Sequence, residues 1–182
     1  MKKVVLTFGL IAGAVLAAMM WITLPFLDIG SDRDAVIGYT TMVAAFLLIY
    51  FGARSYRDDV AGGTVSFGRA FAVGASIAMV ASLCYVASWE VMYFKVTPDF
   101  MEKYQAHELE MARKGGATEA ALAQKKAEMD KFAIQYRNPA FNVAVTLVEP
   151  LPVGLIIALI SAGVLSRRRG NSMAMGQLER ST

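Results

Sequence analysis

The stretch RAFAVGASIAMVASLCYVASWE, residues 69–90, decides how this chain folds. Between Arg69 and Glu90 it carries no charged side chain, and about 20 apolar residues in a helix cross the hydrocarbon core of a bilayer. The whole chain is 56% hydrophobic and only 18% charged, whereas soluble proteins carry about 25% charged residues. The stretch therefore predicts a transmembrane helix.

Three further runs are long and apolar enough to span a bilayer. They are residues 4–27, 35–53 and 140–166, and the opening stretch belongs to a run over residues 66–94. We expect an all-α integral membrane four-helix bundle formed by a single domain, residues 1–170. Residues 1–17 also resemble a signal peptide, but the apolar run exceeds the usual signal core of about 7–15 residues. Retention as a span is therefore favoured over cleavage.

A polar segment, residues 95–138, separates the third and fourth runs and predicts an extramembrane helical hairpin. Gly115-Gly116 breaks a run of helix formers, and Thr118 can cap the second helix. Apolar side chains share one face of each helix, and we expect them to pack on each other or on the membrane: Phe100, Tyr104 and Met111, then Leu122, Met129, Phe132 and Tyr136. Asn138-Pro139 would join the hairpin to the fourth span, and residues 171–182 are expected to form a loose tail.

The basic residues predict the orientation of the spans. The net charge is +3, and Lys and Arg stand at the ends of the apolar runs, as topology signals do. On one side of the membrane lie Lys2 and Lys3 together with the predicted topology anchors: Arg54, Arg57, Arg69, Arg167, Arg168 and Arg169. By the positive-inside rule, both termini are expected in the cytoplasm of a bacterial cell, with the hairpin outside the cytoplasmic (inner) membrane.

The segment GGTVSFGRA, residues 62–70, looks like part of a phosphate-binding loop but lacks its chemistry. That loop needs Lys followed by Ser or Thr after its second glycine, and here Arg69 and Ala70 stand there. We therefore expect a turn: Gly62-Gly63 for the bend, Ser66 as helix cap and Arg69 at the headgroups. No nucleotide site is predicted.

Two acids inside the apolar runs, Glu90 and Glu149, are candidates for a polar intramembrane site. Measured from Arg69 and Arg167 at about 1.5 Å per residue, they lie roughly 31 Å and 27 Å away, near the far edge of a core about 30 Å thick. Asn142 and Thr146 share a helix face with Glu149. One interpretation is interface carboxylates that cap or pair with neighbouring groups, and the other is proton or cation handling. Pro150 and Pro152 should interrupt the helix beside Glu149.

The sequence offers few residues for a disulfide, a metal site or a cofactor. One cysteine, Cys84, and one histidine, His107, provide neither a disulfide nor a metal cluster, so no cofactor is predicted. The placement of the basic residues also argues against nucleic acid. Small residues recur at four-residue spacing, which favours close helix packing within the chain, with self-association as the second interpretation: Gly9 and Gly13; Gly74, Ala78 and Ser82; Gly154, Ala158 and Ala162.

Short motifs along nearly the whole chain resemble the bacterial membrane family called domain of unknown function 4199. They are Gly38-Tyr39, Gly52 with Tyr56-Arg57-Asp58, Gly63 with Ser66-Phe67-Gly68 and Ala70-Phe71, Trp89 with Tyr93, and Pro152-Val153-Gly154-Leu155 with Arg167-Arg168. The resemblance implies a small four-span bacterial membrane protein. It implies no activity and no catalytic residues.

Our first functional hypothesis is a non-enzymatic membrane component. It would act through other membrane or periplasmic proteins that contact residues 99–137. The alternative is a proton- or cation-coupled transporter subunit that uses Glu90 and Glu149, and a membrane-embedded enzyme is the third hypothesis.

Overall fold

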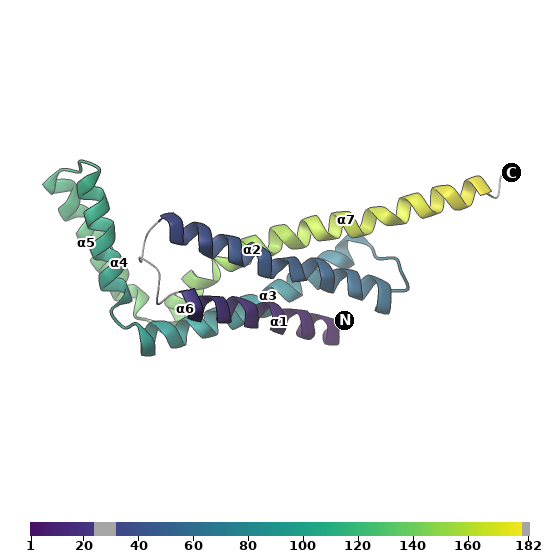
Figure 1. Cartoon of the computed structure of the whole chain (residues 1–182), viewed down its shortest axis with the longest axis horizontal. Helices are drawn as coiled ribbons and strands as arrows, with labels where there is room; N and C mark the ends of the chain where they lie inside the picture. Colours follow the sequence, from purple (N-terminus) through teal and green to yellow (C-terminus); the bar gives the residue numbers. More distant parts are fainter. Residues whose placement is uncertain (24–31, 180–182) are drawn as a thin grey trace.

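The structure, a computed structural model, describes residues 1–23 and 32–179. Within these ranges it is helical and contains no strand. The helices follow in the order α1 (Lys2–Thr23), α2 (Asp32–Ser55), α3 (Phe67–Val91), α4 (Phe100–Lys114), α5 (Glu119–Tyr136), α6 (Pro139–Leu147) and α7 (Pro150–Glu179) (Figure 1). Two π-helical turns, η2 (Tyr56–Val60) and η3 (Met92–Val96), extend α2 and α3.

Four helical segments are long and apolar enough to cross a membrane, so the predicted fold class is confirmed. They cover Lys2–Thr23, Val36–Val60, Phe67–Val96 and Pro139–Ser166. The second segment continues past residue 53 through η2, which places Arg54 and Arg57 inside it. Residues 24–27, the predicted end of the first span, lie outside the described residues.

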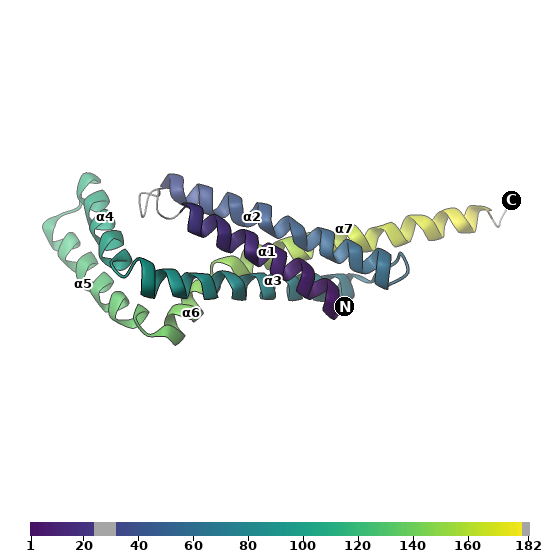
Figure 2. The same ribbon diagram turned by 60° about the horizontal axis from the view of Figure 1, so that its bottom comes forward.

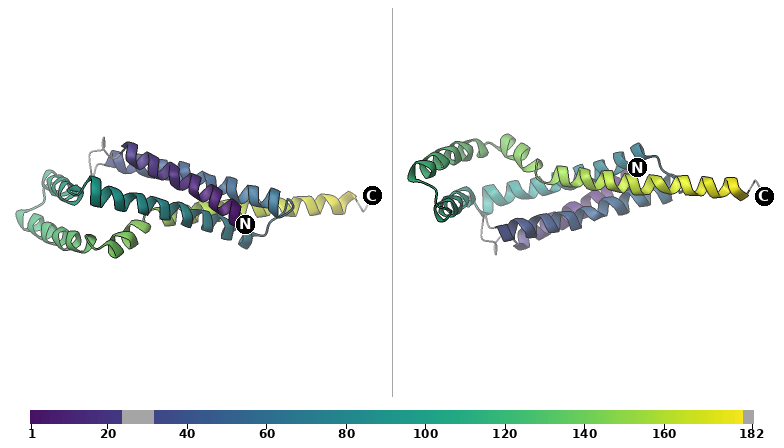
Figure 3. Two further views of the ribbon diagram at one scale, coloured as in Figure 1. Left: turned by 90° about the horizontal axis from the view of Figure 1, so that it is seen from below. Right: turned by 90° about the horizontal axis from the view of Figure 1, so that it is seen from above.

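The bundle is organised around α3, which packs against α1, α2, α6 and α7. Helix α2 also contacts both α1 and α7. Figure 3 shows α1 in front when the molecule is seen from below and α7 in front when it is seen from above, with α2 and α3 between them. The core between these helices is apolar, and Phe46, Ile49 and Ile77 are fully buried in it.

Glycines let the helices approach closely at the positions predicted from the four-residue spacing. A Cβ atom added at Gly13 would lie 2.5 Å from Cys84 Cβ, and one added at Gly154 would lie 2.8 Å from Ala78 Cβ. At Gly74 the added atom would lie 3.0 Å from Ala158 Cβ. Such distances are too short for a side chain, so the small residues pack helix on helix within the chain.

The turn between α2 and α3 is built by glycine, as predicted. Gly62 and Gly63 have φ values of 70° and 86°, a region that side chains disfavour. Ser66 occupies the N-cap position of α3, but its side chain makes no capping hydrogen bond. The backbone N–H of Gly63 donates to Arg57 O at 2.9 Å, which closes the turn onto η2.

Helices α4 and α5 form the predicted hairpin, which lies across one end of the bundle (Figures 1 and 2). The Thr118 hydroxyl caps α5 by accepting from the backbone N–H of Ala121 at 3.2 Å. The first residue of α1 lies at the opposite end of the bundle, and α7 runs out beyond that end (Figure 1).

The fourth span is divided by the Pro150 interruption into α6 and α7. Asn138 caps α6 through its side chain, which accepts from the backbone N–H of Ala140 at 3.0 Å, and Pro139 is its first residue. Helix α7 continues through Glu179, across residues 171–179 for which a loose tail is predicted.

Candidate functional site

A buried hydrogen-bond network joins the hairpin to the bundle where α3, α5 and α6 meet. The indole N–H of Trp89 on α3 donates to Tyr136 Oη at 3.0 Å. Tyr136 Oη lies 3.1 Å from Thr146 Oγ1 on α6, and the Thr146 hydroxyl donates to Asn142 Oδ1, also at 3.1 Å. The Asn142 amide donates in turn to the backbone carbonyl of Tyr136 at 3.3 Å. We call these four residues the joint.

The chemistry of the joint fixes the direction of its hydrogen bonds. An indole nitrogen only donates, and an amide oxygen only accepts. Since the single Thr146 proton goes to Asn142, the Tyr136 hydroxyl must donate to Thr146 and accept from Trp89. All four residues are nearly inaccessible, with Asn142 at 0% and Trp89 at 9% exposure. A fully satisfied buried network of this kind rigidifies its surroundings.

Aromatic rings surround the joint and add packing to its hydrogen bonds. The Trp89 ring lies 4.9 Å from that of Phe100, in an edge-to-face arrangement. Tyr136 packs edge-to-face on Tyr93 at 5.2 Å and stacks on Phe132 at 5.4 Å. Burial raises the pKa of the Tyr136 phenol, so that its proton, which the network needs, is held more tightly.

The predicted polar stripe of Asn142, Thr146 and Glu149 divides into two parts. Asn142 and Thr146 face the buried joint, whereas Glu149 lies beyond the end of α6, is exposed, and accepts from the Tyr85 hydroxyl at 3.0 Å. Glu149 therefore pairs with a neutral donor on α3.

Glu90 lies elsewhere on α3. It follows Tyr85 by five positions, which turns it about 140° around the helix at roughly 100° per residue. Its Oε1 atom is buried and has no hydrogen-bond partner among the described residues. The structure therefore orients Glu90 away from the tyrosine that binds Glu149.

The predicted anchors that the structure describes at side-chain level differ in their surroundings. Arg54 and Arg69 are exposed. Arg57 is only 6% exposed, and its Nε atom donates to Asp58 Oδ1 at 2.6 Å. Residues 167–169 belong to α7, at the end away from the hairpin (Figure 1).

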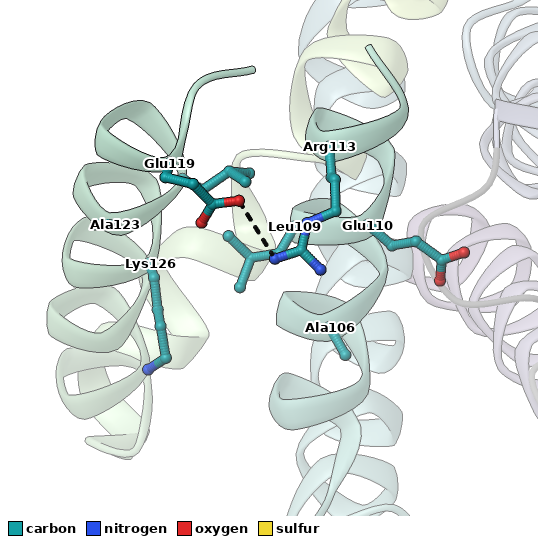
Figure 4. Close-up of a pocket in the computed structure, with 8 residues that line it drawn as sticks. Ala106, Leu109, Glu110, Arg113, Glu119, Ala123 and Lys126 are labelled. Atoms are coloured by element: carbon teal, nitrogen blue, oxygen red, sulfur yellow. Dashed lines mark ion pairs between the residues drawn. The ribbon is translucent and has the colours of Figure 1, made fainter. Parts of the chain in front are cut away.

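A cavity of about 580 Å³ opens between α4 and α5 near the tip of the hairpin (Figure 4). We call it the tip cavity. It combines two leucines with two acids and two bases, and its lining is Ala106, Leu109, Glu110, Arg113, Glu119, Leu122, Ala123 and Lys126. The Arg113 guanidinium reaches across to Glu119, at 4.0 Å. The cavity therefore combines an apolar floor with charged edges.

A second cavity, of about 420 Å³, lies at the base of the hairpin. We call it the base cavity. Its lining combines Tyr93 from η3 with residues of the α3–α4 connection, α4, α5 and the start of the α5–α6 connection: Pro98, Met101, Glu102, Gln105, Asp130, Ala133, Ile134 and Arg137. Within the described part of the chain, no group of His, Cys, Asp and Glu side chains could hold a metal ion.

The sequence interpretation named two of the four joint residues as a polar site and gave the other two different roles. Trp89 was named only among the family motifs, and Tyr136 was placed on the apolar face of a hairpin helix. The indole N–H of Trp89 and the hydroxyl of Tyr136 could have indicated their part in the site. A buried Trp or Tyr normally finds a hydrogen-bond partner for its polar atom.

Comparison with protein families finds one that accounts for most of the chain. The family described as "Protein of unknown function (DUF4199)" matches residues 7–167, a range that includes all four candidate spans almost completely. Comparisons with curated proteins and with solved structures returned no match.

Proposed function

This chain belongs to the DUF4199 family, and on that premise we propose that it is a non-enzymatic membrane component that binds a partner protein through its α4–α5 hairpin. The observation that carries the proposal is the exposure of α4. None of the 15 residues of this helix is buried, although the hairpin is fixed to the bundle by the joint. A rigidly held helix with no fully buried residue leaves surface on which another protein can dock.

The tip cavity supports the same proposal, because it offers both an apolar floor and charges of both signs. Leu122, one of the lining residues, is 6% exposed. Figure 4 shows Arg113 and Glu119 at the edge of the cavity. Protein interfaces combine an apolar centre with a polar rim in this way. The partner segment would place apolar side chains on the leucines and would be held in register by the surrounding charges.

The side of the membrane on which the hairpin lies forms part of the proposal. Helix α1, with Lys2 and Lys3, begins at the bundle end opposite the hairpin, and the turn between α2 and α3 lies there too (Figure 1). By the positive-inside rule, that end is cytoplasmic. The hairpin would then meet its partner on the outer side of a bacterial cytoplasmic membrane.

Substitution of Ala123 tests the proposal without removing the hairpin. Deletion of residues 99–137 would also remove Tyr136 and break the joint, so a loss of binding would have two explanations. Ala123→Arg fills the tip cavity from an exposed position of α5. Ala121→Arg is the matched control, because Ala121 is exposed and lies about 160° away around the same helix.

The measurement is gentle purification of each variant from native membranes, with bound proteins identified by mass spectrometry. A protein that co-purifies with the wild type and with Ala121→Arg, but falls at least about tenfold with Ala123→Arg, is the expected result. Equal recovery with both arginine variants would contradict the proposal. So would the absence of any stoichiometric partner from the wild-type sample.

One observation favours the alternative of a proton- or cation-coupled transporter subunit. The Oε1 atom of Glu90 is buried without a partner in the described part of the chain, and ionisable groups within spans often serve transport. Neither of the two hairpin cavities is lined by Glu90 or Glu149. Ion flux into proteoliposomes that is unchanged by Glu90→Gln and by Glu149→Gln would reject this alternative.

A further inference from the structure

The base cavity lies where two of the candidate membrane spans end. Tyr93 precedes Val96, the last residue of the third candidate span, and Arg137 precedes Pro139, the first residue of the fourth. Because both spans cross the edge of the hydrocarbon core here, the cavity is at the level of the lipid headgroups. The aromatic rings of the joint are at the same end of α3, as expected for an interfacial belt.

Two donors in the base cavity have no acceptor among the described residues. The Arg137 guanidinium has no carboxylate within ion-pair distance among the described side chains. Gln105 Nε2 is buried, and no described residue accepts from it. Buried donors normally have partners, and guanidinium and amide N–H groups are suited to phosphate oxygens.

Two carboxylates line the same cavity, so it also offers acceptors for a cation. Asp130 accepts from Lys126 Nζ at 2.8 Å, whereas Glu102 has no cationic side chain within ion-pair distance in the described ranges. The cavity therefore presents donors for an anion and a free carboxylate for a cation within about 420 Å³. That volume lies in the usual range for ligand sites, about 300–1,000 Å³.

We propose that the base cavity binds the headgroup of a zwitterionic phospholipid with a primary ammonium, the chemistry of phosphatidylethanolamine. The phosphate accepts from Arg137 and Gln105, and the ammonium donates to Glu102. A quaternary choline headgroup has no N–H to donate, and a glycerol headgroup has no cation. Ile134, which is 71% exposed at the cavity, lies beside the apolar part of the lipid.

This site goes beyond the partner proposal and does not depend on it. The tip cavity and the base cavity occupy different ends of the hairpin and share no lining residue. Loss of protein binding with Ala123→Arg and loss of lipid binding with a base-cavity variant are therefore separate results.

The test is native mass spectrometry of the full chain in mixed micelles that contain phosphatidylethanolamine, phosphatidylcholine or phosphatidylglycerol. We expect phosphatidylethanolamine to bind about tenfold more tightly than phosphatidylcholine, the effect of one charge-assisted hydrogen bond. Arg137→Gln should weaken phosphatidylethanolamine binding by about tenfold. Arg137→Lys, which keeps the charge, should restore part of it. Arg113→Gln, at the hairpin tip, is the matched control and should leave binding unchanged.

Three results would overturn the proposal. The first is equal binding of the ethanolamine and choline lipids, and the second is an equal effect of Arg137→Gln and Arg113→Gln. The third is competition by free glycerophosphoethanolamine at the same concentration as the lipid, since that would assign the site to a soluble ligand. Glu102→Gln is an independent test of the contact proposed for the ammonium. It should reduce the preference for phosphatidylethanolamine over phosphatidylglycerol. An unchanged helical circular dichroism spectrum shows that each variant is folded.

Discussion

Replacement of Tyr136 by phenylalanine removes one hydroxyl from the centre of the joint and keeps the ring. That hydroxyl lies 3.0 Å from Trp89 Nε1 and 3.1 Å from Thr146 Oγ1. Each intramolecular hydrogen bond contributes about 1 kcal/mol net, and a buried donor left without an acceptor costs about 1–3 kcal/mol. Because Trp89 is 9% exposed, its indole N–H would be such a donor. We expect Tyr136→Phe to lower the free energy of unfolding by about 2 kcal/mol.

Tyr93→Phe is the matched control for this substitution. Tyr93 is 5% exposed and its ring lies 5.2 Å from that of Tyr136, but its hydroxyl makes no hydrogen bond to another described residue. Its loss should change stability by less than about 0.5 kcal/mol. The assay is reversible unfolding in mixed micelles, followed by tryptophan fluorescence, with helix content checked by circular dichroism. If Tyr136→Phe loses no more stability than Tyr93→Phe, the hydrogen bonds of the joint do not hold the hairpin.

Three further predictions concern titration, packing and topology. Burial raises the folded-state pKa of Tyr136 above its ordinary value of 10.0, so the stability that this residue contributes is complete below pH 10 and is lost as the pH rises from there through the folded pKa. Absorbance titration of Tyr136→Phe should therefore show one late-titrating tyrosine fewer than the wild type. Gly13→Ala should destabilise the bundle by about 1–3 kcal/mol in the same unfolding assay, because the new Cβ atom would lie 2.5 Å from Cys84 Cβ. At Gly38 an added Cβ atom would meet no atom within 4 Å, so Gly38→Ala should be neutral or stabilising by up to about 1 kcal/mol. A cysteine that replaces Ala117, in a chain that also carries Cys84→Ala, should react with a membrane-impermeant maleimide added outside intact cells. Labelling only after lysis would show that the orientation is the opposite of the predicted one.

Local features of this fold were predictable from the sequence because their causes are local. The glycine pair at residues 62–63 requires positive φ, Thr118 precedes a run of helix formers, and Pro150 cannot continue the hydrogen-bond ladder of the preceding helix. The apolar runs likewise predicted the four spans, because length and hydropathy are read directly from the chain. Ser66 shows the limit of such rules: it occupies the cap position without making the capping bond.

The site was harder to predict from the sequence because its contacts join distant parts of the chain. Trp89 and Tyr136 are 47 positions apart, and Tyr85 and Glu149 are 64 apart. Neither pair shares a helix, so no periodicity predicts the contact. Asn142 and Thr146 were identified because they are polar residues one turn apart on an apolar helix. Their partners were overlooked because tyrosine and tryptophan also fit an apolar stripe or an aromatic belt.

Site-specific photo-crosslinking in native membranes tests the central claim, that the hairpin is a docking element, most directly. A photoreactive amino acid would replace Ala123 in the tip cavity and, in a matched sample, Ala121 on the opposite face of α5. The account predicts one discrete protein adduct from position 123, little or none from position 121, and loss of the adduct when Lys126→Glu reverses a charge at the cavity edge. Equal adducts from both positions, or adducts only to lipid, would contradict it.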